Sequence, residues 1–242
     1  MPSLTVLSNY TGLDTNNGGG FEPPDTQGAA GPSSVVETVN QSIRIDTPKS
    51  TGAAPVTDTL ADFFFTKGGL ANGGATFEQS DPFTIYDPQV QRFIVGDIDF
   101  DSSMTNGGAN YLLLAVSTSN NPATLTTADW TFSELTTTEA GVALQDYPGN
   151  PGYNADALVV TQASFDSGGG YVHTLVNAIS MNALVTGAPL TVGPNTFQTD
   201  ISEVLPRPAV MPDSTPGGPM WMTASAGGGV FGGAATTLDV VE

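Results

Sequence analysis

Apolar and polar residues alternate in short runs along most of the chain, which is the period of a half-buried β-strand. Clusters rich in glycine, proline and asparagine, such as TNGGAN and PGNPGYNAD, separate these runs and are typical of turns. Many short strands joined by tight turns predict an all-β protein. The predicted strands cover residues 35–45, 92–100, 110–117, 130–135, 157–165, 171–179 and 220–225.

Long helices are not expected, because 29 glycines and 18 prolines interrupt the chain. Residues 56–67 and the neighbourhood of 124–140 are free of both residues for long enough to form one. Both stretches are rich in threonine and aromatic residues, which favour strands. We therefore predict strand or irregular structure in both.

A weak internal repeat appears when the predicted strands are aligned. Each of four units opens with a charged residue beside proline or tyrosine, passes through a short strand and a turn, and continues into a stronger strand. The openings are Asp25, Asp81, Asp146 and Arg207, spaced 56, 65 and 61 residues apart. Four strands in a repeat of roughly this length are typical of a β-propeller blade. The prediction is a β-propeller-like fold of about four blades, complete or part of a larger ring, with a β-sandwich as the alternative.

The domain prediction follows from the repeat. Residues 25–242 form one β-propeller-like domain, and residues 1–24 form an N-terminal segment. The last unit lacks an outer strand, and residues 3–8 (SLTVLS) could supply it from the other end of the chain. If they do not, the open strand edge could pair with a second copy.

Composition restricts the partners. The chain has 5 lysines and arginines against 24 aspartates and glutamates, a formal net charge of −19. Such a surface repels phosphate groups, so nucleic acid and anionic lipid are excluded as expected partners, whereas cations suit it. Without cysteine there is no disulfide or thiolate chemistry. No apolar run approaches the roughly 20 residues that span a bilayer.

Localisation is predicted from composition. Residues 1–10 lack the basic and apolar regions of a signal peptide. The bias toward glycine, threonine, asparagine and aspartate, with little lysine, nevertheless favours a secreted or extracellular protein.

Three segments carry a family resemblance: residues 21–52 (FEPPDTQGAAGPSSVVETVNQSIRIDTPKSTG), DPFTIYDPQVQRFIV and DYPGNPGY. The first resembles the opening of bacterial secreted β-propeller-like proteins, some of which are described as sialidase-like. The other two resemble the later blade starts of such proteins. The resemblance covers most of residues 21–225 and implies a propeller. A sialidase would also carry several Asp boxes and an arginine triad. Here no Asp box is intact and the only arginines are Arg44, Arg92 and Arg207, so sialidase activity is not expected.

The unit openings are the first candidate site. If the units are blades, Asp25, Asp81 and Asp146 converge near a central channel with Arg207 as the fourth corner. Carboxylates that lie close together either bind a cation or repel one another, which raises the pKa of one of them. The alternative is that each aspartate caps backbone amides in its own turn.

Aromatic residues add candidates for ligand stacking. Tyr147 and Tyr153 lie among glycines and prolines in a predicted loop and could stack on a ligand. Trp221, within a predicted strand, is expected to fill the core instead.

Asp97, Asp99 and Asp101 are the candidate metal ligands, because alternate residues of a strand point to one face and three carboxylates could hold one calcium ion. Their D-x-D-x-D spacing also begins calcium loops, but Ser102 stands where an EF-hand needs glycine, which excludes that motif. The alternative is a solvated strand end.

His173, the only histidine, is predicted to be structural. Nearby Ser164 and Asp166 lack a nucleophile elbow. One histidine without cysteine also argues against the usual tetrahedral zinc site.

Three functions remain open. The first is a secreted, non-catalytic binding module for a glycan or an extracellular protein, stabilised by calcium. The second is a glycoside hydrolase that uses two of Asp25, Asp81 and Asp146, whose carboxyls must then lie about 5–9.5 Å apart. The third is an extracellular surface protein that assembles into homo-oligomers through an open blade edge. The sequence favours binding over catalysis.

Overall fold

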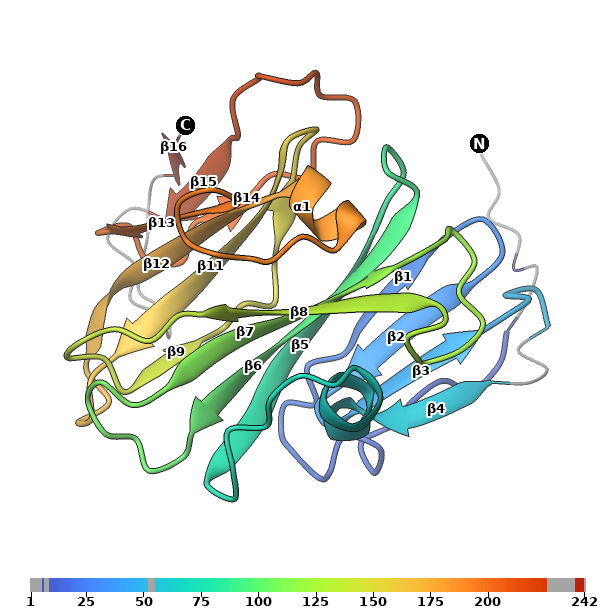
Figure 1. The fold of residues 1–242 in the computed structure, drawn as a ribbon, viewed down its shortest axis with the longest axis horizontal. Helices are drawn as coiled ribbons and strands as arrows, with labels where there is room; N and C mark the ends of the chain where they lie inside the picture. Colours follow the sequence, from blue (N-terminus) through green and yellow to red (C-terminus); the bar gives the residue numbers. More distant parts are fainter. Residues whose placement is uncertain (1–5, 7–8, 52–54, 226–237, 242) are drawn as a thin grey trace.

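The fold is all-β, as predicted. The structure is a computed structural model that describes residues 6, 9–51, 55–225 and 238–241. Strands make up 43% of the described residues and helices 7%. The strands form four antiparallel sheets that follow one another in chain order, and none of the sheets closes on itself (Figure 1). Four sheets in series differ from the two-layer sandwich that the sequence left open.

Each sheet is essentially a meander in which strands that follow in sequence lie side by side. Sheet A contains β1 (Gln27–Ala30), β2 (Val35–Val39), β3 (Ser42–Asp46) and β4 (Val56–Thr59). Sheet B contains β5 (Phe77–Asp87), β6 (Arg92–Asp101), β7 (Asn110–Ser117) and β8 (Trp130–Thr136). Sheet C contains β9 (Leu144–Asp146), β10 (Gly152–Tyr153), β11 (Ala157–Phe165), β12 (Tyr171–Ser180) and β13 (Thr196–Ile201). Sheet D contains β14 (Arg207–Pro208), β15 (Met222–Ser225) and β16 (Leu238–Val241).

The predicted strands are confirmed, with one difference in sheet A. Residues 35–45 were predicted as one run, but they form the hairpin β2–β3. The chain reverses at Gln41, which has a φ of 74°. Alternation of apolar residues continues through this tight turn, so the pattern does not reveal it.

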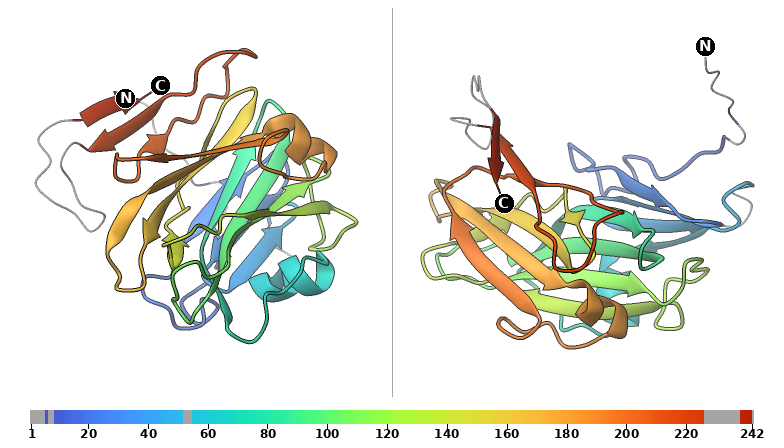
Figure 2. Two further views of the ribbon diagram at one scale, coloured as in Figure 1. Left: turned by 60° about the vertical axis from the view of Figure 1, so that its left-hand side comes forward. Right: turned by 90° about the horizontal axis from the view of Figure 1, so that it is seen from above.

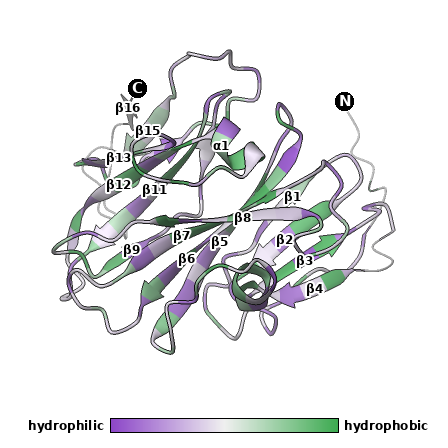
Figure 3. Cartoon of the chain, in the orientation of Figure 1, coloured by the Kyte–Doolittle hydropathy of each residue, from purple (hydrophilic) through white to green (hydrophobic). Residues whose placement is uncertain are grey.

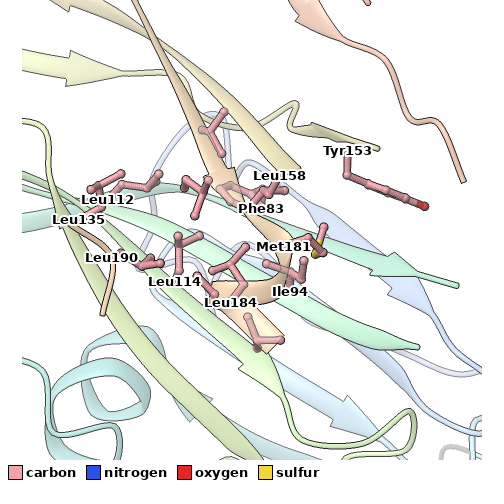
Figure 4. Close-up of a cluster of buried hydrophobic side chains, with 14 residues drawn as sticks. Phe83, Ile94, Leu112, Leu114, Leu135, Tyr153, Leu158, Met181, Leu184 and Leu190 are labelled. Carbon is pink, nitrogen blue, oxygen red and sulfur yellow. The ribbon is translucent and has the colours of Figure 1, made fainter. Parts of the chain in front are cut away.

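The hydrophobic core lies between successive sheets. Along β6, Phe93 and Val95 pack toward sheet A, whereas Ile94 packs toward sheet C. Leu113 and Leu114 of β7 divide in the same way. Alternate residues of a strand point to opposite faces, so both faces of sheet B are buried. Figure 3 shows the hydrophobic positions along these strands, and Figure 4 shows the cluster between sheets B and C.

Sheet C is likewise in contact with sheets on both sides. Leu158 and Val160 of β11 belong to the cluster shared with sheet B. Val159, between them, packs with Met222 of β15 in sheet D. Figure 2 shows the sheets side by side in this order. Each apolar face is thus covered by the next sheet.

Two helical segments were not predicted. The first, η1 (Asp62–Lys67), is a single π-helical stretch that buries Phe63 and Phe64 between sheets A and B. The ring of Phe63 lies edge-on to Trp130, with 5.4 Å between centroids. The prediction of strand or irregular structure over 60–67 is therefore wrong, because burial of the aromatic residues outweighs their strand propensity.

The second helix, α1 (Met181–Thr186), is short and capped at both ends. The Ser180 hydroxyl accepts a hydrogen bond from the Ala183 amide, and Gly187 ends the helix with a φ of 69°. Serine before and glycine after a helix are its usual boundary residues. These caps were visible in the sequence, but the six-residue helix is shorter than its apolar pattern can identify.

The last part of the chain contains the predicted strand, but the predicted role of Trp221 in it is wrong. Residues 220–225 contain β15, but Trp221 is 41% exposed, so its predicted core role is wrong. The neighbouring Met222 takes the buried position instead. The predicted closing strand at 3–8 lies largely outside the described residues. Within the described ranges, no helix is long and apolar enough to cross a membrane.

Burial of sheet B on both sides predicts that adjacent residues of β7 contribute equally to stability. Leu113→Ala and Leu114→Ala should each lower the free energy of unfolding by about 2–5 kcal/mol, the usual cost of truncating a buried leucine. Thr136→Ala, at an exposed position of β8, should change it by less than about 0.5 kcal/mol. Urea unfolding measures all three. If one leucine variant behaved like Thr136→Ala, one face of sheet B would be exposed in solution.

Candidate functional site

Three of the four unit openings predicted from the sequence line one pocket, and the fourth lines a hollow next to it. This pocket has a volume of about 190 Å³ and is lined by Asp25, Asp81, Tyr147 and Arg207 among others. A neighbouring hollow shares Asp25, Asp81 and Tyr147 and adds Asp146. Because these residues come from the starts of four different sheets, the pocket lies where the sheets converge.

The local structure places each carboxylate differently. Asp25 lies just before β1, and Asp146 is the last residue of β9. Asp81 was predicted at the start of a strand, but β5 begins at Phe77. Asp81 therefore lies inside β5, where the register with β6 shifts between Ser80 and Phe83. Such a bulge redirects a side chain out of the regular ladder.

A backbone irregularity occurs in or close to the first strand of each sheet. Asp25, Asp81, Tyr147 and Leu205 have positive φ values of 46°, 58°, 62° and 43°. Residues other than glycine seldom adopt this region, although aspartate tolerates it better than most. All four residues line the pocket.

Asp81 is the centre of the carboxylate cluster. The side chains of Asp25 and Asp146 both lie within hydrogen-bonding reach of the Asp81 carboxyl. Asn40 links two of the three: its Nδ2 donates to Asp25 Oδ2 at 2.6 Å, and its Oδ1 accepts from the Asp81 amide at 2.9 Å. The aspartates therefore interact with one another and do not only cap their own turns.

Burial and mutual repulsion raise the pKa values of two of these groups. Burial, followed by the neighbouring Asp146, raises the pKa of Asp81 to about 8. Burial, followed by Asp81, raises the pKa of Asp25 to about 6. Burial and the neighbouring Asp146 carboxyl thus favour the protonated form of Asp81.

Asp97 adds a fully buried carboxyl to this cluster. It is 0% exposed and lies on β6 opposite the bulge that contains Asp81. Its Oδ1 accepts a hydrogen bond from the Ile98 amide at 3.0 Å, while its buried Oδ2 has no hydrogen-bond partner among the described residues. Burial, followed by Asp81, raises its pKa well above the usual value. Asp97 thus belongs electrostatically to the pocket.

The predicted metal triplet does not form one site. Asp97 and Asp99 are buried, and burial followed by the Glu134 charge raises the pKa of Asp99 to about 7. Asp101 lies at the strand end, where its Oδ1 accepts from the Ser103 amide at 3.0 Å and this bond lowers its pKa. The carboxylate oxygens of these three aspartates do not all lie within 4.8 Å of one another. Alternation along β6 predicted a common face for the three aspartates, but their side chains do not converge on a position for one ion.

The two candidate tyrosines lie in different environments. Tyr147 lines the pocket, and burial followed by Asp146 raises its pKa. Tyr153 is only 3% exposed and belongs to the core between sheets B and C (Figure 4). Its hydroxyl donates to the Tyr86 carbonyl at 3.4 Å. Because β10 turns Tyr153 into the core, it is not a candidate ligand residue.

One cluster had no sequence signal. His173 Nε2 lies 2.9 Å from Glu139 Oε2 and 3.4 Å from Asp200 Oδ1. The three atoms that could bind a metal lie within 4.8 Å of one another, an arrangement found for no other such trio in the described ranges. The three residues are far apart in sequence, so only the pairing of strands in sheet C could reveal the group.

Comparison of the chain with family models, with curated proteins and with solved structures gave no match. The resemblance to secreted propeller-like proteins therefore stays a prediction from the residues alone.

The pKa of Asp81 predicts how stability depends on pH in the absence of cations. The folded chain keeps a proton on Asp81 up to a pH of about 8, whereas the unfolded chain releases it near its usual pKa of 3.8. Stability should therefore be highest at low pH within this window and should fall as pH rises toward about 8. Asp81→Asn should make the fall between about pH 6 and 8 shallower.

Thermal unfolding in the presence of a chelator, at constant ionic strength, measures this dependence. Asp213→Asn changes an exposed aspartate away from the pocket and should keep the slope of the unaltered chain. An unchanged slope in Asp81→Asn would show that Asp81 ionises normally.

Proposed function

We propose that the chain is a secreted, non-catalytic binding module whose central carboxylates hold a calcium ion that helps to bind a glycan. The observation that carries the proposal is the convergence of Asp25, Asp81 and Asp146 from three separate sheets on one pocket. Its acidic composition, with little lysine, supports export into a medium where calcium is plentiful.

The architecture that we propose is a four-bladed propeller, complete or part of a larger ring. Serial packing of sheets A to D supports it, because each sheet would be one blade. The location of the pocket also supports it, since the first strands of propeller blades surround the central channel. Ligand sites in such folds are built from residues contributed by several blades.

The residues in the pocket fit a calcium ion that is held by two of the aspartates, because the oxygens of Asp25, Asp81 and Asp146 do not all lie within 4.8 Å of one another. They offer only oxygen ligands, which calcium prefers, and three carboxylates carry more negative charge than the pocket can keep without protons or a cation. None of Asp25, Asp81, Asp97 and Asp146 forms a salt bridge in the described part of the chain. The buried Oδ2 of Asp97, next to this cluster, has no hydrogen-bond partner among the described residues.

The arrangement leaves room for a ligand on the ion. Calcium takes six to eight oxygens. Asp81 with either neighbour supplies two carboxylates, so further positions remain for water or for the hydroxyls of a sugar. Tyr147 offers a ring at the same pocket, and Arg207 offers a guanidinium that makes no hydrogen bond or ion pair with other described residues. Burial lowers the pKa of Arg207.

Catalysis is less well supported by this geometry. A glycosidase needs two carboxyls about 5–9.5 Å apart. Asp81 lies within hydrogen-bonding reach of both neighbours, so no pair that includes Asp81 has that separation. Only Asp25 and Asp146 remain as a pair for acid–base chemistry.

Calcium should stabilise the folded chain. At a hundredfold excess over the dissociation constant, a site that exists only in the folded state adds about 2.7 kcal/mol. For a domain of this size that corresponds to a rise in melting temperature of roughly 5–10 °C. Asp81→Asn should abolish the rise, whereas Asp213→Asn should keep it. The measurement is thermal unfolding with calcium and with chelator. Equal melting temperatures in both conditions would remove calcium from the proposal.

Glycan binding and glycan cleavage are separated by a second measurement. The chain should retain oligosaccharides on a glycan array only with calcium, and Tyr147→Ala should reduce this signal. It should release no reducing ends from the bound glycans. Release that is lost in both Asp25→Asn and Asp146→Asn would replace the binding module with a hydrolase.

A further inference from the structure

We propose that Glu139, His173 and Asp200 form a second metal site, specific for a divalent first-row transition metal such as Zn²⁺ and separate from the central pocket. The site lies at the end of the interface between sheets B and C. His173 is on β12, Asp200 is on β13, and Glu139 belongs to the connection from β8 to β9. The ligands therefore come from three segments that only the folded chain brings together.

The strand register explains how the side chains meet. Gln145 of β9, Ser164 of β11 and His173 of β12 stand opposite one another in one row of sheet C. Asp200 is opposite Leu175, two residues beyond His173 on the same face. Glu139 covers this face from the connection leaving sheet B, and its Oε2 lies 2.9 Å from His173 Nε2.

The distances suit one small ion. Zinc bonds to nitrogen and oxygen of about 2.0–2.2 Å, at angles between octahedral and tetrahedral values, place neighbouring ligand atoms roughly 2.9–3.5 Å apart. The separations from His173 Nε2 are 2.9 Å to Glu139 Oε2 and 3.4 Å to Asp200 Oδ1. The observed trio therefore needs little movement to enclose such an ion.

Gln145 gives an independent sign of a missing group. This residue is 1% exposed, and its Nε2 donates to Glu139 Oε2 at 2.8 Å. Its Oε1, on the same amide, is buried and has no hydrogen-bond partner in the described part of the chain. A water molecule bound to the metal would donate to this oxygen. The Gln145 amide would at the same time hold the Glu139 ligand in place, as residues behind metal ligands commonly do.

The ligand set distinguishes this site from the central pocket. One imidazole nitrogen with two carboxylates suits zinc and other first-row metals, whereas calcium prefers oxygen alone. Three protein ligands also leave a position open for water, as in many zinc sites. The single histidine does not prevent zinc binding here, since carboxylates complete the set.

The single histidine makes the test specific. In tag-free, chelator-treated protein labelled with ¹⁵N-histidine, every imidazole signal belongs to His173. One equivalent of Zn²⁺ should shift the Nε2 resonance, and Ca²⁺ should not. Exposed carboxylates that bind zinc weakly elsewhere do not contribute to this signal.

Variants of the carboxylates test the full site. Glu139→Gln and Asp200→Asn should each weaken zinc binding, measured by the same His173 resonance. The loss of affinity should be at least roughly 10- to 100-fold, which is the usual effect of replacing a residue that only supports a metal ligand. Asp81→Asn and Asp213→Asn should leave zinc binding unchanged. Melting temperatures show that each variant is folded.

Two results would overturn the proposal. If the His173 resonance does not move at a tenfold excess of Zn²⁺, the cluster is only an ion pair. If it moves equally in both carboxylate variants, the histidine binds zinc without them. Either result would leave the calcium proposal for the central pocket unaffected, because the two sites share no residue.

Discussion

The structure depends on one constraint, the burial of both faces of sheet B. Phe93 and Val95 cannot avoid water without sheet A, and Ile94 and Leu114 cannot do so without sheet C. Neighbouring sheets also meet at some of their first strands, since β1 contacts β5 and β10 contacts β14. The apolar packing therefore determines where the polar starts of the strands lie, although it does not contact them.

The carboxylate cluster opposes folding in the absence of a cation. Folding brings Asp25, Asp81 and Asp146 together and removes Asp97 from water, so each group loses hydration and gains a like-charged neighbour. The positive φ values at Asp25 and Asp81 add a local cost at the same place. Such costs persist when surrounding packing supports them, and they concentrate at functional sites because a ligand can recover them.

Much of the fold could be predicted from the sequence, since it depends on local alternation. The period of two along residues 92–100 and 110–117 gives strands whose bounds agree closely with β6 and β7. The sequence placed Asp25, Asp81, Asp146 and Arg207 near one another, and in the structure they line two neighbouring hollows. The helix η1 was missed because its phenylalanines have strand propensity and become helical only through burial against Trp130. Tyr153 was misassigned because proximity to glycine and proline does not show which way a side chain faces.

The site around His173 shows why the remainder could not be predicted. Gln145 and Asp146 are consecutive residues of a three-residue strand, and consecutive residues point to opposite faces. Gln145 therefore reaches the Glu139–His173 pair, while Asp146 reaches the central pocket. No spacing in the sequence indicates this division, because it depends on the pairing of β9 with β11. The short strand β9 thus contributes one side chain to the cluster around His173 and the next to the aspartate cluster of the central pocket. A change in its register by one residue would exchange the two side chains and disrupt both.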